Sequence, residues 1–182
     1  MQIITGKYRA RKLVAVDSLE TRPTLARVKE SVFNLIADKI EDGVVLDLFA
    51  GSGSYGVECI SRGAQSVFFV DQSEKAIKVI KTNTQRISEK FEIIKSSFVD
   101  ALNSFEKRNI KFDLVFLDPP YDSDFSIKSI ELLCKKKLLN NGAILCVEHK
   151  LANDLQNLPE CCIMKKSRRY GIAYVDILEY KE

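Results

Sequence analysis

Apolar residues in this chain form short runs that alternate with stretches of helical periodicity, the pattern typical of a parallel α/β sheet. The runs at 44–49, 65–70, 91–94, 114–117 and 143–148 predict buried strands, and two further strands are expected at 161–166 and 173–180. Helices are predicted at 25–40, 54–61, 73–88 and 126–139, with another starting near residue 98. The pattern therefore predicts one α/β domain with a seven-stranded, mostly parallel sheet.

The N-terminal 40 residues read as a basic hairpin or extended arm followed by a helix, ahead of a core at 41–182. Lys7, Arg9, Arg11 and Lys12 precede any acidic residue. These charges fit either a solvated edge or an arm that contacts phosphates, and both interpretations stay open. Arg22 and Arg27 lie near the start of the helix, where free N–H groups suit a phosphate.

Length and composition argue against a membrane, secreted or metal-binding protein. The 182 residues suffice for one domain, expected to be monomeric and cytoplasmic, with no membrane-spanning run and no secretory leader. The five cysteines form no C-x-x-C pair, which favours reduced thiols over disulfides or zinc. No metal ligand set surrounds the single histidine, His149. We therefore expect no metal site.

Gly51, Gly53 and Gly56 form a G-x-G-x-x-G motif between a strand and a helix, where such a loop approaches a nucleotide-like cofactor. Asp71 ends the next strand and suits the hydroxyls of a ribose. Asp47 favours S-adenosylmethionine over a nicotinamide dinucleotide, because an acid there can hold the methionine ammonium but would repel a pyrophosphate.

Aromatic and acidic residues at the ends of other strands complete the expected cofactor site. We assign Phe49 to it, with Ser97, Phe98 and Asp100 as candidates for contact with the adenine. The alternative interpretation of this segment, a helix-capping residue and a core phenylalanine, is equally good.

Asp118, Pro119, Pro120 and Tyr121 follow a buried strand and suit chemistry on the amino group of a nucleobase. A carboxylate and the Pro119 carbonyl can accept the two amino hydrogens, and a tyrosine can stack on a flipped-out base. The alternative is a strand that simply ends at a Pro-Pro turn.

Two further segments, 165–171 and 140–142, are expected to form turns or helix ends. Residues 165–171 read as a basic hairpin tip, in which Arg168 and Arg169 either bind RNA or lie in a solvated turn. Residues 140–142, Asn-Asn-Gly, are expected to close the helix before the fifth strand.

These features together resemble an S-adenosylmethionine-dependent methyltransferase of the Rossmann-like class I fold. The segments 4–13, 22–34 and 46–58 are similar to the bacterial family that methylates guanine N2 in the 16S RNA of the small ribosomal subunit. The chain departs from that family at Leu25 and Ala26, where polar residues are usual, and at Asp71, where glutamate is common. Residues 96–100 do not align cleanly, which leaves the adenine contact open.

The resemblance implies roles for particular residues. Asp118 and Pro119 orient the guanine amino group, and Tyr121 stacks on the base. Asp47, Gly51, Gly53 and Asp71 hold S-adenosylmethionine. The RNA-facing basic residues are Arg22 and Arg27, with Lys7, Arg9, Arg11, Arg168 and Arg169 as further candidates.

Three alternative functions remain at this point. A DNA adenine-N6 methyltransferase can share the Asp-Pro-Pro-Tyr motif, but no sizeable DNA-reading insert is evident in these 182 residues. A nicotinamide-dependent oxidoreductase shares the glycine loop but leaves Asp118 unexplained. A non-catalytic RNA-binding module would have no use for the complete loop and the acid together.

Overall fold

The computed structural model describes residues 1–16, 23–120, 124–149, 155 and 157–182, with only the backbone described for residues 23–27. None of the helices in this part of the chain combines the length and the apolar character that crossing a bilayer requires. The helices are α1 (Pro23–Leu35), a 3₁₀ turn (Ala37–Lys39), α2 (Ser54–Ser61), α3 (Glu74–Asn83), α4 (Phe98–Lys107) and α5 (Phe125–Lys135). The strands are β1 (Val44–Asp47), β2 (Ser66–Asp71), β3 (Phe91–Lys95), β4 (Phe112–Leu117), β5 (Leu139–His149), β6 (Cys162–Tyr170) and β7 (Ala173–Tyr180).

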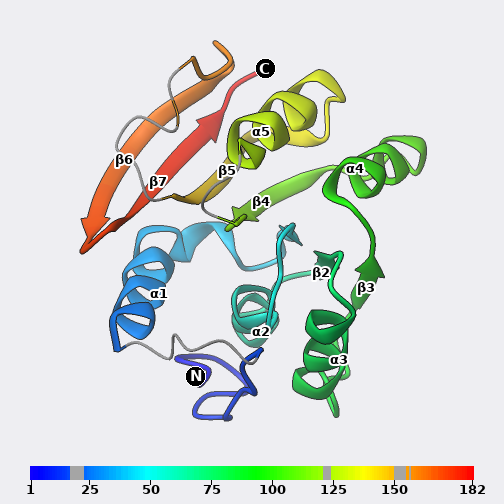
Figure 1. The fold of residues 1–182 in the computed structure, drawn as a ribbon, viewed down its shortest axis with the longest axis vertical. Helices are drawn as coiled ribbons and strands as arrows, with labels where there is room; N and C mark the ends of the chain where they lie inside the picture. The colour runs from blue at the N-terminus through cyan, green and yellow to red at the C-terminus, as the bar shows by residue number, and fades with distance from the viewer. Residues whose placement is uncertain (17–22, 121–123, 150–154, 156) are drawn as a thin grey trace.

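The seven strands form one sheet in the order β3-β2-β1-β4-β5-β7-β6 (Figure 1). Neighbours from β3 to β5 pair in parallel, whereas β7 runs antiparallel to both β5 and β6. The predicted seven-stranded, mostly parallel α/β fold is confirmed. The strand order reverses at β1 and β4, and open sheets of this kind bind ligands beside such a reversal.

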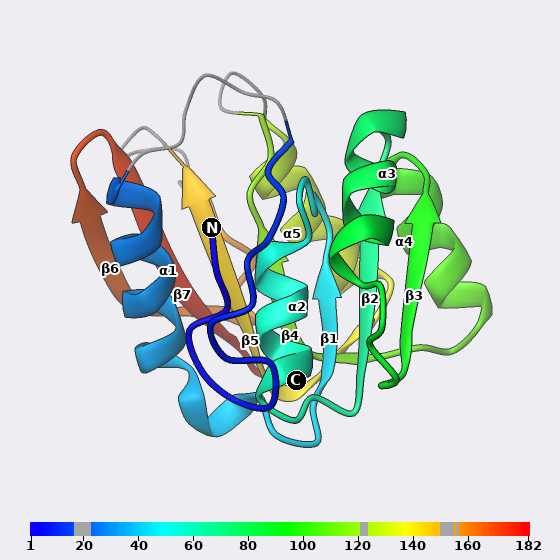
Figure 2. The same ribbon diagram turned by 90° about the horizontal axis from the view of Figure 1, so that it is seen from below.

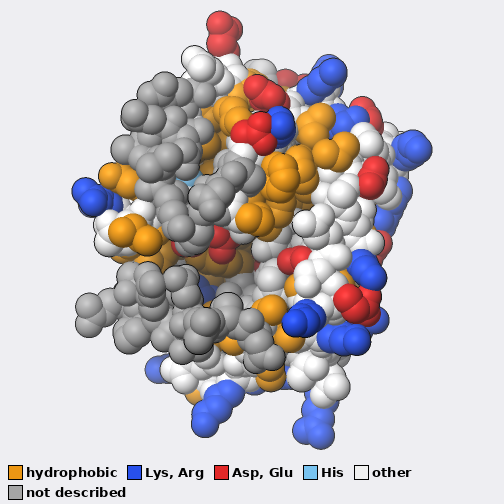
Figure 3. Space-filling view, in the orientation of Figure 1, with side chains coloured by type: hydrophobic (Ala, Val, Ile, Leu, Met, Phe, Trp, Pro, Cys, Tyr) orange, Lys and Arg blue, Asp and Glu red, His pale blue; other side chains and the backbone are white. Residues whose placement is uncertain are grey.

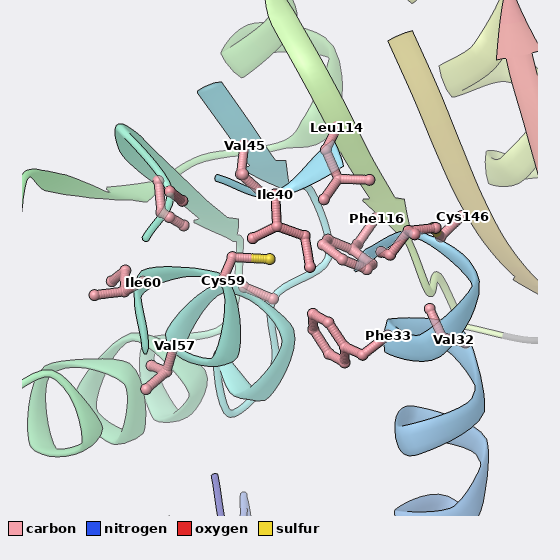
Figure 4. Close-up of a cluster of buried hydrophobic side chains, with 14 of the residues drawn as sticks. Val32, Phe33, Ile40, Val45, Val57, Cys59, Ile60, Leu114, Phe116 and Cys146 are labelled. Carbon is pink, nitrogen blue, oxygen red and sulfur yellow. The ribbon is translucent and has the colours of Figure 1, made fainter. Parts of the chain in front are cut away.

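Helices cover both faces of the sheet, with α1, α2 and α3 on one face and α4 and α5 on the other (Figure 2). Each face has its own apolar core. In the first core Phe33 and Phe116 lie with ring centroids 5.8 Å apart, beside Cys59 and Val45 (Figure 4). Burial on both faces explains why the central strands read as continuous apolar runs.

The N-terminal segment forms the predicted hairpin, closed by a bridge between Gln2 and Lys12. The amide of Ile3 donates to the carbonyl of Arg11 at 3.0 Å. Ile3 and Leu13 are buried in the same core as α1 and α2. The hairpin is therefore packed against the sheet-covering helices, as the dark blue ribbon crossing α2 shows in Figure 2.

Residues 140–142 do not close α5, and that expectation is wrong. Lys137 adopts a left-handed conformation (φ 52°) and ends the helix earlier, so that β5 already begins at Leu139. Pairing with β4 steps from Phe112–Leu139 to Leu114–Ile144. The Asn-Asn-Gly segment is thus taken up by an irregularity inside β5.

The basic segment 165–169 is not a hairpin tip, because β6 continues through it to Tyr170. Its residues pair with β7, including Arg169 with Tyr174. The turn itself is made at Gly171 and Ile172. Antiparallel pairing extended the strand beyond its apolar start, because residues 163–169 at the edge of the sheet are exposed and tolerate charge.

Candidate active site

The carboxyl ends of β1, β4 and β5 meet at one edge of the sheet. Leu117 of β4 pairs with Val147 of β5, so that Asp118 and Glu148 come next on adjacent parallel strands. A cavity of about 530 Å³ opens at this edge. On the face shown in Figure 3 the surface is hollowed, with acidic and hydrophobic side chains visible inside the hollow. The cavity is lined by Met1, Gln2, Ile3, Ile4, Arg9, Ala10, Lys29, Glu30, Phe49, Ala50, Gly51, Ser52, Ser54, Tyr55, Asp118 and Glu148.

Asp118 lines this cavity and has a strongly raised pKa. Asp118 is exposed at the cavity, and loss of solvation beside the surrounding protein raises its pKa above the ordinary 3.8. The negative charges of Glu148 and Asp47 raise that pKa further. Two carboxylates in one poorly solvated site disfavour simultaneous ionisation. A ligand that donates hydrogen bonds to both carboxylates would offset this repulsion and favour their ionised forms.

Tyr55 links Glu148 to the core. Its hydroxyl donates to Oε2 of Glu148 at 3.5 Å, and its ring stacks on Phe116 with centroids 4.8 Å apart. Burial, followed by the charges of Glu148 and Asp118, raises the tyrosine pKa well above 10.0. The hydroxyl therefore stays protonated and acts as a fixed donor beside the two acids.

The glycine loop forms another part of the cavity wall. Gly51 has φ 52°, and a Cβ built there would meet nothing within 4 Å. Its amide donates to Oδ2 of Asp71 at 2.8 Å, while Oδ1 of the same carboxylate accepts from the amide of Ser73 at 2.8 Å. Asp71 therefore fixes the loop to the start of α3. The empty space around Gly51 leaves room for a ligand in contact with the backbone.

Asp47 bonds to the helix that follows the glycine loop and is not among the residues that line the cavity. It is 3% exposed, and its Oδ2 accepts from the amide of Gly56 at 3.0 Å. Its pKa is raised to about 7, mainly by burial; the hydrogen bond from Gly56 opposes this shift and the charge of Asp71 adds to it. The expected contact between Asp47 and a methionine ammonium remains a prediction. Its role within the protein is to hold the first turn of α2.

Phe49 and Phe98, both assigned to the cofactor, are brought together. Their ring centroids lie 5.6 Å apart, and Phe125, which the sequence did not single out, stacks on Phe49 at 6.3 Å. Ser97 caps α4: its Oγ accepts from the amide of Asp100 at 3.1 Å and donates to Oδ2 of the same residue at 2.7 Å. The three rings form an apolar group suited to a flat heterocycle, and the adenine contact expected for Asp100 remains a prediction.

A buried acid on α2 fastens the N-terminal hairpin against the cavity. Glu58 is 0% exposed, and its carboxylate accepts from the amides of Ile4 at 2.9 Å and Thr5 at 3.0 Å. Arg62 donates to it at 2.9 Å, and the ammonium of Lys29 lies 3.0 Å away. No local sequence signal marks Glu58, because its four partners come from three separate segments.

Asn83, at the end of α3, is another functional residue that the sequence did not single out. Its side-chain amide donates to the carbonyls of Ser52 at 2.8 Å and Val14 at 2.9 Å. Its oxygen accepts from the amide of Val14 at 2.8 Å. One amide therefore ties the glycine loop to the chain that leaves the N-terminal hairpin.

The basic residues assigned to RNA do not form one cluster. Arg9 lines the cavity, whereas Lys7 pairs with Glu89 at 2.5 Å and Arg11 donates to the carbonyl of Gln85. Arg168 and Arg169 are exposed at the end of β6, on the same edge as the cavity but not in its lining. Arg22 and Tyr121 lie outside the described residues, as does the side chain of Arg27.

Solved structures share this fold along the whole chain. The yhhF protein of Escherichia coli matches with a TM-score of 0.89 and 28% identity, covering 100% of this chain and 98% of the other. A methylase structure from Haemophilus influenzae matches with a TM-score of 0.82 and 33% identity over 100% and 98%. The SMU.776 structure, complexed with S-adenosylhomocysteine, matches in fold at 0.70 and 12% identity, over 94% of this chain and 52% of that one.

Sequence comparison agrees with the fold. The chain is 37% identical over 176 residues to the Haemophilus influenzae protein named ribosomal RNA small subunit methyltransferase D, covering 95% of this chain and 90% of that one. The Escherichia coli protein of the same name is 31% identical over 175 residues, with 96% and 87% covered. The model of the family described as Conserved hypothetical protein 95 matches residues 1–179. The chain therefore belongs to that family and has its methyltransferase fold.

Proposed function

We propose that this protein transfers a methyl group from S-adenosylmethionine to the exocyclic N2 of a guanine in the 16S RNA of the small ribosomal subunit. Its relatives named as small-subunit RNA methyltransferases support the reaction and the class of substrate. One structural observation carries the choice of guanine. Asp118 and Glu148 lie on adjacent strand ends and line the same cavity as the glycine loop.

The Watson–Crick edge of guanine suits two neighbouring carboxylates. Guanine presents N1–H and the N2 amino group, which are all donors, and ionised carboxylates only accept. Adenine presents its amino group beside N1, which is an acceptor and would face a second carboxylate unfavourably. The pair Asp118 and Glu148 therefore favours guanine once the base is flipped into the site.

The cofactor fits the loop and the aromatic cluster. Gly51 has open space around its α-carbon, and the relation to a fold seen with S-adenosylhomocysteine agrees with that space. Phe49, Phe98 and Phe125 offer an apolar group for the adenine. S-adenosylmethionine supplies the methyl group on a positively charged sulfur. Asp71 keeps the loop in the shape that such a ligand needs.

Asp118 and Pro119 act on the guanine amino group by positioning it. The carboxylate and the carbonyl accept the two amino hydrogens, which turns the nitrogen lone pair toward the methyl carbon. A nitrogen–carbon bond forms as the carbon–sulfur bond breaks, and the amino proton then leaves to Asp118 or to water. Tyr55 donates to Glu148 and holds the second carboxylate in place throughout.

The decisive experiment measures methyl transfer from labelled S-adenosylmethionine to small subunits, and to naked 16S RNA, from cells that lack this activity. The product RNA is digested and the labelled nucleoside identified. N2-methylguanosine in 16S RNA is the expected result. N6-methyladenosine would overturn the choice of base, and no label on either substrate would overturn the reaction.

A thermal-shift assay separates the cofactor from the chemistry. We expect S-adenosylhomocysteine to raise the unfolding temperature and NAD to leave it unchanged. The opposite ranking would contradict the methyltransferase assignment and favour a nicotinamide-dependent enzyme on the same glycine loop.

A further inference from the structure

Cys134 and the adjacent pair Cys161 and Cys162 come together between the end of α5 and the beginning of β6. Cys134 lies in the last turn of α5, Cys161 directly precedes β6, and Cys162 is the first residue of β6. The three sulfur atoms all lie within 4.8 Å of one another, and Sγ of Cys134 is 3.4 Å from Sγ of Cys162. All three are free thiols, of which Cys162 is buried and the other two half-buried.

The backbone holds this thiol cluster (Cys134, Cys161 and Cys162) from both sides. The carbonyl of Cys161 accepts from the amide of Lys181 at 2.8 Å, and the amide of Cys162 donates to the carbonyl of Pro159 at 2.8 Å. The carbonyl of Cys134 accepts from the amide of Lys137 at 3.0 Å. Ligands held on ordered elements form a site without rearrangement of the chain.

We propose that the thiol cluster binds one thiophilic metal ion, Zn²⁺, through three thiolates. A zinc–sulfur bond of about 2.3 Å in tetrahedral geometry places the sulfurs about 3.8 Å apart. The separations in the cluster, from 3.4 Å to within 4.8 Å, bracket that spacing. The cluster contains no histidine or carboxylate among the described residues, so that water or a small thiol takes the fourth position.

The number of thiols separates metal binding from a disulfide. A disulfide needs two sulfurs about 2.05 Å apart and leaves a third without a role. Here the third sulfur lies within the same small sphere as the other two, which is the arrangement that one ion needs. No local pattern in the sequence indicates this cluster, because 26 residues separate Cys134 from Cys161 and only the fold brings them together.

The location makes this a site separate from the cavity. Since β5 and β6 both run antiparallel to β7, Cys162 lies at the edge where β5 begins. Asp118 follows the end of β4, at the opposite edge. The ion would therefore fasten α5 to the antiparallel end of the sheet, and its presence is independent of the proposed methyl transfer.

The test uses the full chain, purified metal-free under a non-thiol reductant and titrated with Zn²⁺ against a chromophoric chelator. We expect one equivalent to bind, with release of protons from the thiols. Co²⁺ in place of Zn²⁺ should give the near-ultraviolet charge-transfer absorption of three thiolates. A folded wild-type chain that does not compete with the chelator would overturn the proposal.

Matched variants locate the ion. Cys134→Ser and Cys161→Ser should each weaken binding at least about 100-fold, whereas Cys59→Ala should not change it because Cys59 lies buried in α2. Circular dichroism checks that each variant is folded, and Cys161→Ser alters a half-buried residue outside the strands. Equal binding by wild type and both serine variants would contradict the site. So would a Cys134–Cys162 disulfide, found by mass spectrometry, that forms in air while no Zn²⁺ binds to the reduced chain.

Discussion

Asp118 and Glu148 are the residues that follow a paired position, Leu117 with Val147, on the two adjacent strands β4 and β5. The parallel register therefore sets the two carboxyls side by side at the mouth of the cavity. Loss of solvation, and then the charge of Glu148, raises the pKa of Asp118, and the hydroxyl of Tyr55 donates to Glu148 from the core side. Under the proposed function, this relationship sets both the base that the site accepts and the pH dependence of the reaction.

The rate of methyl transfer should depend on pH through the ionisation of Asp118. In the proposed mechanism methyl transfer needs ionised Asp118, whose pKa is raised above 3.8. The rate should therefore fall on the acid side at a higher pH than an ordinary carboxyl would give. Glu148→Gln removes one charge that raises this pKa and should move the acid limb to lower pH. The measurement is kcat/KM against pH. Glu30→Gln, in the same cavity, serves as the control and should leave the limb in place.

Replacement of Asp118 itself should separate turnover from binding. Asp118→Asn keeps the size of the side chain but replaces the charged acceptor with a neutral amide, whose NH2 is a donor. The guanine amino group would lose its charged acceptor, so kcat should fall by about 100-fold or more. Affinity for S-adenosylhomocysteine, measured by calorimetry, should stay within about threefold of wild type. Full turnover by Asp118→Asn would remove this residue from the proposed mechanism.

The architecture could be predicted because each central strand is buried on both faces and reads as an unbroken apolar run. The strand-end acids Asp71 and Asp118 were visible for the same reason, since each interrupts such a run. Glu148 was not, because its importance depends on the register between β4 and β5. Partners that meet only in space, such as Glu58 with Ile4, leave no local signal.

Helix and strand ends were predicted less well, again for physical reasons. A left-handed Lys137 ended α5 early, and no sequence rule favours lysine there over the Asn-Asn-Gly that follows. The Asp100 assignment shows the same limit. An acid two residues into a helix suits either a ligand or the cap, and the structure shows it bonded to Ser97.

Glu58 should be the residue on which the N-terminal hairpin depends. Burial raises its pKa, but the charge of Lys29, the amide of Ile4 and the contact with Arg62 outweigh burial and lower it below 4.5. Glu58→Gln leaves Lys29 with an uncompensated buried charge, which costs about 3–5 kcal/mol of stability when a buried pair is broken. Thermal unfolding and hydrogen exchange at residues 3–5 measure the loss.

The same group predicts a dependence of stability on pH. An acid whose folded pKa is lowered stabilises the protein above its unfolded pKa, here 4.5, and loses that contribution as the pH falls toward the folded value. Wild type should lose more stability below pH 4.5 than Glu58→Gln does. Glu92→Gln breaks an exposed pair with Arg108 and is the control, with little expected change. Equal acid sensitivity of wild type and Glu58→Gln would contradict this.

Gly56 tests the packing beneath the glycine loop. A Cβ there would lie 2.2 Å from Cε1 of Phe69, a contact that the buried ring cannot accept without displacement. Gly56→Ala should destabilise the fold by about 1–3 kcal/mol through overpacking and weaken cofactor binding. Adding Phe69→Leu should recover part of both, which a double-mutant cycle by thermal unfolding would show. Additive losses in the double variant would point away from this contact.

Arg9 should contribute to RNA binding more than its neighbours do. It lines the cavity, whereas Lys7 is occupied by Glu89 and Arg11 by a backbone carbonyl. If Arg9 neutralises one phosphate, Arg9→Glu should weaken RNA binding and reduce the slope of log affinity against log salt by about one. Lys107→Glu, with the same charge change at the far end of α4, is the matched control. Filter binding across a salt series distinguishes the two variants. Identical slopes would show that only the net charge of the protein matters and that Arg9 makes no phosphate contact of its own.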